Sequence, residues 1–167
     1  KPLLLFSLSA YWWSLKDELK DLKVFKLILL ALVFSLIGDI SLMLSYDFGF
    51  ILGMGFFLLA QALYSSSYMK LAKLKLTSIL LASPLIITGI YLVNFVLILP
   101  TEMIIPINVY ALSLSLHMLY AVNYCRINFK KNQFAFYGAA LFFVSDLMIA
   151  FNKFQYDSIE IAIAVML

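Results

Sequence analysis

Two aspartates lie inside long apolar stretches of this sequence, where an ionised side chain is costly. Asp146 lies within residues 134–152 and Asp39 within residues 24–46, and both stretches are almost entirely apolar. Each is long enough to cross a bilayer, which takes about 20 apolar residues. A carboxylate there costs about 3 kcal/mol unless it is paired, hydrated or protonated. The two acids therefore indicate a functional site inside a membrane. The alternative is a pair of structural acids satisfied by serine and backbone groups.

The composition is that of a membrane protein with several spanning helices. Of 167 residues, 65% are hydrophobic and 13% are charged, which excludes an ordinary soluble domain of this size. One cysteine excludes a disulfide framework within the chain, and one histidine excludes a three-histidine zinc site. We therefore expect an all-α, polytopic transmembrane bundle that uses no metal or other cofactor and binds no nucleic acid.

Seven apolar segments can be drawn along the chain, each interpreted as one membrane span. They cover residues 2–15, 24–46, 48–69, 77–99, 102–124, 134–152 and 158 onward. The first is short for a span, at roughly 21 Å as a helix. We predict one transmembrane domain over residues 1–167. We also expect further residues at both ends, because the chain begins without Met and stops inside an apolar run.

The basic residues alternate between the two sides of this arrangement. Ten of the twelve lie around residues 16–26, 70–76 and 125–133, and only Lys1 and Lys153 lie on the opposite side. Because basic residues are retained in the cytoplasm, these three loops are predicted to be cytoplasmic. We expect a multi-pass protein of a bacterial inner membrane or a plasma membrane.

The predicted orientation brings the two acids to one depth. The helices that carry Asp39 and Asp146 both run outward, and each acid precedes the outer end of its stretch by six or seven residues. At about 1.5 Å per residue both acids lie roughly 10 Å below the outer surface, as does Tyr110 on the helix over residues 102–124. Two carboxyl groups and a phenol could therefore meet in one layer.

Polar and aromatic side chains recur at helical spacing near this layer, on faces that can line a shared interior. Each residue by itself also fits an ordinary helix contact, and small residues among them let helices approach closely in lipid. Together with the acids they are candidates for binding substrate or orienting the reacting groups. These candidates are Gln61, Tyr64, Tyr110, Ser113, His117 and Ser145.

A wider set of residues resembles a known family. In order, the chain carries Gly38-Asp39, then Gly53, Phe57, Gln61 and Tyr64, then Pro106, Tyr110 and Met118, and finally Gly138-Ala139, Phe142, Ser145-Asp146, Ala150 and Phe154. In this order and spacing they resemble the YhhN-like, or lysoplasmalogenase, family of integral membrane proteins, over most of the chain. Gln61 stands where many relatives carry His, and Gln can still hold a hydrogen bond.

The resemblance implies both a fold and an activity. The fold is all-helical with about eight spans, one of them before Lys1. The activity is hydrolysis of the vinyl ether bond of lysoplasmalogens, which gives a fatty aldehyde and a glycerophospho-base. The partners implied are therefore a vinyl-ether lysophospholipid as substrate and the surrounding membrane lipid.

A pair of acids suits this reaction. A vinyl ether is hydrolysed by protonation of its outer carbon and attack of water on the oxocarbenium-like cation, and glycosidases divide similar work between two carboxyl groups. Two acids in a low-dielectric layer cannot both ionise easily, so one stays protonated as general acid. The sequence does not say which; our starting assignment is Asp146 as acid and Asp39 as base. We expect the two side chains to approach within about 10 Å.

A proton-coupled transporter of lipids or small molecules is the main alternative function, because buried acids also relay protons or bind cations. No inverted repeat is evident, and the two acid-bearing stretches run in the same direction. An aspartyl intramembrane protease is disfavoured because Leu36 replaces the glycine that its motif needs before Ile37. A non-catalytic membrane scaffold is the third alternative.

The loop orientation can be tested directly. We predict that a cysteine placed at position 73 or 130 is protected from a membrane-impermeant thiol reagent in intact cells, because both positions lie in lysine-rich cytoplasmic loops. The measurement is labelling before and after the membrane is permeabilised. Ready labelling from outside would overturn the orientation and, with it, the argument that the acids share one depth.

Overall fold

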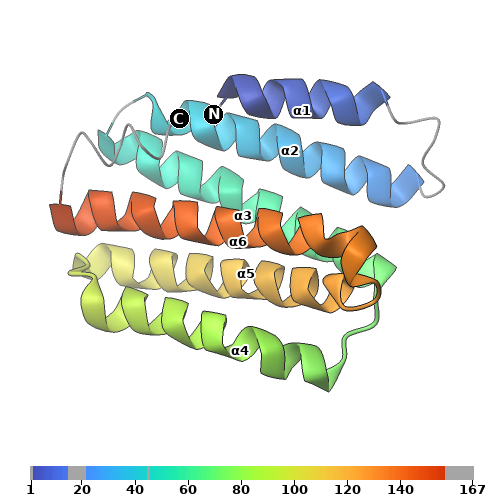
Figure 1. The fold of residues 1–167 in the computed structure, drawn as a ribbon. Coiled ribbons are helices and arrows are strands. Elements are labelled where there is room, and N and C mark those ends of the chain that lie inside the picture. Colours follow the sequence, from blue (N-terminus) through green and yellow to red (C-terminus); the bar gives the residue numbers. More distant parts are fainter. Residues whose placement is uncertain (1, 15–21, 45, 157–167) are drawn as a thin grey trace. The chain divides into compact units, whose positions relative to one another are not determined.

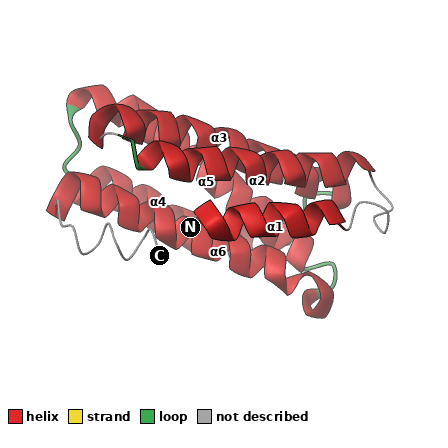
Figure 2. Cartoon of the chain, turned by 90° about the horizontal axis from the view of Figure 1, so that it is seen from above, coloured by secondary structure: helices red, strands yellow, loops and turns green. Residues whose placement is uncertain are grey.

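The fold consists of helices joined by short connections, with no strand among the residues that the structure describes (Figure 2). This structure is a computed structural model, and it describes residues 2–14, 22–44 and 46–156. The chain divides into an N-terminal unit, Lys1–Lys70, and a C-terminal unit, Leu71–Leu167, and each is described here by itself. The predicted all-helical class is confirmed, while the single-domain organisation stays a prediction.

The N-terminal unit contains α1 (Pro2–Ser14), α2 (Leu22–Leu42) and α3 (Tyr46–Leu71). Helix α1 packs against α2, as Figure 1 shows. The Trp12 indole stacks on the Phe25 ring with centroids 6.0 Å apart, and its Nε1 donates to the Phe25 carbonyl at 3.2 Å. An indole that is apolar on its face and polar at one edge thereby joins the two helices.

Glycines allow α2 and α3 to approach closely. A Cβ added to Gly38 would lie 2.9 Å from the Phe57 ring, and one added to Gly53 would lie 3.1 Å from the Gly38 carbonyl oxygen. A Cβ on Gly49 would collide with the Ser41 carbonyl oxygen. Small residues at such crossings let helix backbones meet where lipid offers no hydrophobic drive for association. The contact holds Asp39, the neighbour of Gly38, on the packed side of α2.

The C-terminal unit contains α4 (Leu76–Tyr91), α5 (Thr101–Cys125) and α6 (Phe129–Phe151). Short π-helical segments continue α4 and α6 as η1 (Leu92–Val96) and η2 (Asn152–Tyr156). Helix α5 lies between α4 and α6 (Figure 1). A Cβ on Gly89 of α4 would lie 2.6 Å from the Phe143 ring of α6, so this ring packs directly on the α4 backbone.

Five helices, not the predicted seven, are long and apolar enough to cross a membrane. They are Leu22–Leu42, Phe48–Leu71, Leu76–Val96, Thr101–Cys125 and Phe129–Gln155. Helix α1 has only 13 residues and would reach about 20 Å, against a hydrocarbon core of about 30 Å. The seventh predicted span, from residue 158, lies outside the described residues. The protein is therefore a multi-pass membrane protein with at least these five spans.

Two helix boundaries differ from the sequence-based expectation in ways that matter for the site. Helix α2 ends at Leu42 rather than at residue 46, because Met43 and Leu44 turn back by donating to the Ile40 and Ser41 carbonyls. Asp39 therefore lies in the last turn of α2, closer to its end than expected. Helix α6 begins at Phe129 rather than at residue 134, since the Asn128 side chain accepts from the Lys131 backbone N–H and caps it.

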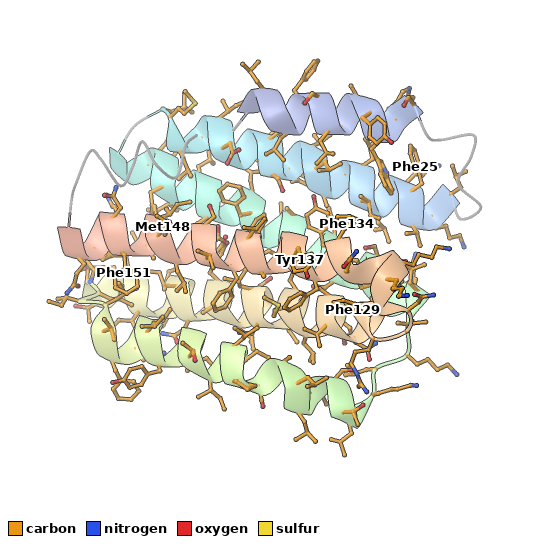
Figure 3. All side chains as sticks on the ribbon, viewed as in Figure 1. Phe25, Phe129, Phe134, Tyr137, Met148 and Phe151 are labelled. Atoms are coloured by element: carbon orange, nitrogen blue, oxygen red, sulfur yellow. The ribbon has the colours of Figure 1, made fainter. Side chains whose placement is uncertain are left out.

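Large apolar side chains project outward from the helices (Figure 3). On α6, Phe134 is 77% exposed and Leu141 is 71% exposed, and Tyr137 lies between them at 47%. Such surface would be a liability in water but is expected where lipid tails are the solvent. The exposed faces of α4 and α5 are similarly apolar, which agrees with the multi-pass assignment.

The close approach of α2 and α3 predicts a contrast between two glycine substitutions. Gly49→Ala should lower the free energy of unfolding by about 1–3 kcal/mol, because the new methyl displaces the Ser41 carbonyl. Gly55→Ala is the matched control on the same helix, where a Cβ meets nothing within 4 Å, and it should be neutral or slightly stabilising. Thermal unfolding in detergent measures both. Equal stability of the two variants would contradict the described crossing.

Candidate functional site

A hydrogen bond between α5 and α6 defines the first part of the candidate site. The Tyr110 hydroxyl donates to Asp146 Oδ2 at 2.5 Å, and both side chains are partly buried. Hydrogen bonds to an ionised carboxylate are short and strong, and more so where the dielectric constant is low. The bond therefore fixes one carboxyl oxygen of Asp146 in place. The predicted meeting of Tyr110 with a membrane-buried acid is seen here within one unit.

His117 lies further along the same helix pair. Its ring is 3% exposed and contacts Phe142 of α6 edge-to-face, with centroids 5.9 Å apart. Seven residues separate it from Tyr110, which is about 10 Å along α5. Phe142 likewise precedes Asp146 by about one turn. The same α5–α6 interface thus holds His117 in a layer next to that of the Tyr110–Asp146 pair.

Two serines complete the candidates of the C-terminal unit. Ser113 lies on α5 between Tyr110 and His117, is half-buried, and makes no hydrogen bond within the described part of the chain. Ser145 directly precedes Asp146 on α6 and is also half-buried. Ser113 follows Tyr110 by about one helical turn and Ser145 adjoins Asp146 in the sequence, so both serines lie near this level of their helices.

The N-terminal unit holds the other acid in its α2–α3 interface. Asp39 is 8% exposed, and Gln61 of α3 is fully buried. Gly38 packs on Phe57, and Gln61 follows Phe57 by one helical turn, so both polar residues lie close to this crossing. Tyr64 lies beside Ser35 of α2, itself one turn from Asp39. Buried polar groups of this density are rare in ordinary helix contacts and are costly in hydrocarbon.

The structure thus assembles the eight candidates into two groups. Tyr110, Ser113, His117, Ser145 and Asp146 share the C-terminal unit, and the N-terminal unit holds Asp39, Gln61 and Tyr64. The distance between the two carboxyl groups joins the two units, so the expected approach within about 10 Å stays a prediction. Among the described residues, no three or more His, Cys, Asp or Glu side chains come together as metal ligands do.

One buried polar residue of the C-terminal unit was missed by the sequence analysis. Asn123 of α5 is 3% exposed; its Oδ1 accepts from Ser78 Oγ at 2.8 Å and from the Lys75 backbone N–H at 3.2 Å. Its Nδ2 donates to the Lys73 carbonyl at 3.1 Å. The signal in the sequence was an amide inside an apolar helix, where its donors and acceptors need protein partners.

Comparison with known proteins gives one match. The model of the YhhN family matches residues 1–167, the whole length of the chain. Searches of curated proteins and of solved structures found no match. The family match covers both groups of candidate residues.

The Tyr110–Asp146 bond predicts energetic coupling between the two residues. Tyr110→Phe should lower the free energy of unfolding by about 1–3 kcal/mol, because a carboxylate inside the membrane loses its donor. In an Asp146→Ala background the same change should cost little, which gives a coupling energy of about 1 kcal/mol or more. Tyr137→Phe, an exposed phenol of α6, is the control and should be neutral. Strictly additive effects of Tyr110→Phe and Asp146→Ala would show that the bond contributes nothing.

Proposed function

Because the chain belongs to the YhhN family, we propose that it hydrolyses the vinyl ether bond of lysoplasmalogens to a fatty aldehyde and a glycerophospho-base. The observation that carries the proposal is the hydrogen bond from Tyr110 to Asp146 inside the membrane span. It holds the carboxyl group of a membrane-embedded acid in place between two helices. The family supplies the expected substrate, and the residues supply the acid–base groups.

The reaction needs one proton donor and one proton acceptor. A protonated carboxyl group gives its proton to the outer carbon of the vinyl ether, and the C=C electron pair forms the new C–H bond. The resulting oxocarbenium-like cation is attacked by water at the carbon bonded to oxygen. A carboxylate takes a proton from that water, and the hemiacetal then breaks into the aldehyde and the free glycerol hydroxyl. Two carboxyl groups suffice for these steps, as in glycosidases.

The hydrogen bond suggests which acid plays which role. Asp146 accepts a hydrogen bond from Tyr110, which holds its carboxyl group at a fixed place between α5 and α6. We assign this fixed carboxyl group as the base that activates water, in place of the starting assignment from sequence. Asp39, buried in the last turn of α2, is then the proton donor. A carboxylic acid kept neutral by an apolar site is a known catalytic device.

The remaining candidates are positioning groups in this proposal. Tyr110 holds Asp146, and the fully buried Gln61 and its neighbour Tyr64 orient groups at the α2–α3 crossing. His117, packed on Phe142, lies about two helical turns along α5 from Tyr110. We assign Ser113 and Ser145 to binding water or the polar part of the substrate, since both hydroxyls lie beside the Tyr110–Asp146 pair.

The proposal also includes an orientation. Basic residues lie in the last turn of α3, at the residue before α4, at the residue after α5 and in the first turn of α6. By the distribution of positive charge we assign these ends to the cytoplasm. The acids then lie toward the opposite membrane surface. A lysophospholipid reaching the site from that leaflet would bring its vinyl ether, next to the headgroup, to the depth of the acids.

The central prediction concerns the two aspartates. Asp39→Asn and Asp146→Asn should each lower turnover at least about a hundredfold, the scale of general acid–base catalysis, with little loss of stability. Gln61→Ala and His117→Ala should cost less, because they orient rather than transfer protons. Glu102→Gln is the matched control, an exposed acid in the first turn of α5, and should keep full activity. The assay measures fatty aldehyde released from a vinyl-ether lysolipid, with an ester lysolipid as the comparison substrate.

One outcome would contradict the mechanism, and another would contradict the function itself. Near-full activity of both Asn variants would exclude the two-acid mechanism while leaving the reaction itself in place. Failure of the unmodified protein to release aldehyde from any lysoplasmalogen, combined with proton-dependent flux in sealed vesicles, would favour the transporter.

A further inference from the structure

A cluster of exposed cations lies at the end of the C-terminal unit that is remote from Asp146. It consists of Lys73 and Lys75 in the α3–α4 connection and Arg126, which follows the last residue of α5; we call it the cationic end. All three side chains are exposed. Glu102 and Asp146 are the acids that the structure describes in this unit. Glu102 lies in the first turn of α5, about 36 Å along the helix from Arg126.

A buried polar network holds the cationic end in shape. Asn123 accepts from the Lys75 backbone N–H at 3.2 Å and donates to the Lys73 carbonyl at 3.1 Å, so one amide pins the connection to α5. Ser78 Oγ donates to the same Asn123 oxygen at 2.8 Å, and Ser78 is fully buried. A fully satisfied network of this kind rigidifies the backbone around it. Both lysines are therefore carried by backbone of fixed position.

Arg126 lies beside this network, and its hydrogen-bond partners among residues 2–14, 22–44 and 46–156 are neutral hydroxyl oxygens. Its Nη1 donates to Ser78 Oγ at 3.1 Å and to Thr77 Oγ1. Within the described residues, Arg126, Lys73 and Lys75 make no ion pair. A guanidinium has five N–H donors, so several of them stay open to solvent. Over the described residues the fold thus gathers three positive charges with no acidic partner, and two hydroxyls hold one of them.

We propose that the cationic end binds the phosphate of an anionic phospholipid headgroup. The cluster lies at the ends of membrane-spanning helices, the level at which headgroups lie, and basic pockets between such helices bind anionic lipids. A guanidinium that is already held in place suits a phosphate, which it can bind through two parallel hydrogen bonds. The anion supplies a counter-charge, which the described residues do not provide there.

A lipid fits better than free phosphate because the surface beside the cluster is apolar. On α4, Leu76 and Leu80 flank Thr77 by sequence and by one helical turn, and they are 71% and 64% exposed. Ile127, next to Arg126, is 59% exposed. An acyl chain can lie on these side chains while its phosphate binds the cations. Neither the vinyl ether reaction nor the loop orientation is needed for this inference.

The test compares lipids on the purified protein in an uncharged detergent. Phosphatidylglycerol should bind with saturation, measured by native mass spectrometry and as a rise in the unfolding temperature, and phosphatidylcholine should bind at least about tenfold more weakly. Arg126→Gln should weaken phosphatidylglycerol binding about tenfold, the loss of a charge-assisted hydrogen bond. Lys26→Gln, an exposed lysine of α2 with the same charge change, is the control and should leave binding within about twofold.

Two further variants and a soluble ligand complete the test. If Arg126→Gln unfolds, the variants Lys73→Gln and Lys75→Gln take its place, because these side chains make no hydrogen bond in the described residues. Each should weaken binding about fivefold. Equal binding of both lipids, equal losses in Lys26→Gln and the cluster variants, or equal stabilisation by soluble glycerol phosphate would each overturn a specific lipid site.

Discussion

A carboxyl group inside the hydrocarbon needs a hydrogen-bond donor, and this need determines how the helices of the C-terminal unit pack. Asp146 meets that need with the Tyr110 hydroxyl, so α6 must lie against α5 with these two residues at one level. The antiparallel register that follows brings His117 to Phe142 about two turns away along α5. One hydrogen bond and one ring contact thus agree on the same alignment. Because bilayer interiors offer no water as an alternative partner, this alignment is more strongly specified than apolar packing alone would make it.

The N-terminal unit reaches a buried acid by a different route. At its glycines, α2 and α3 lie so close together that an added Cβ would crowd the neighbouring helix. Asp39 directly follows one of these glycines, Gly38. Close backbone approach excludes lipid from the acid, while Gln61 and Ser35 make the crossing polar. The early end of α2 moves Asp39 into the final turn, where a helix approaches the membrane surface.

Different functional candidates occupy the two ends of the C-terminal unit. One end carries the Asp146 carboxyl group, and the other carries the cationic end organised by Asn123. Arg126 follows Tyr110, the hydrogen-bond donor of Asp146, by 16 residues, which is about 24 Å along α5. In our proposals the acid takes part in proton transfer, and the cations bind an anionic headgroup.

Local sequence determined the membrane class, the helices and the family, because hydropathy, helical spacing and short motifs depend on neighbours along the chain. It also singled out Asp39, Asp146 and Tyr110, since an ionisable or phenolic group in an apolar stretch stands out without any structure. The structure decided the end of α2 at Leu42, the hydrogen bond between Tyr110 and Asp146, and the role of Asn123. Those features depend on which helix faces come together and on separations of a few tenths of an ångström. Such separations arise from packing between distant residues, which no local pattern in the sequence encodes.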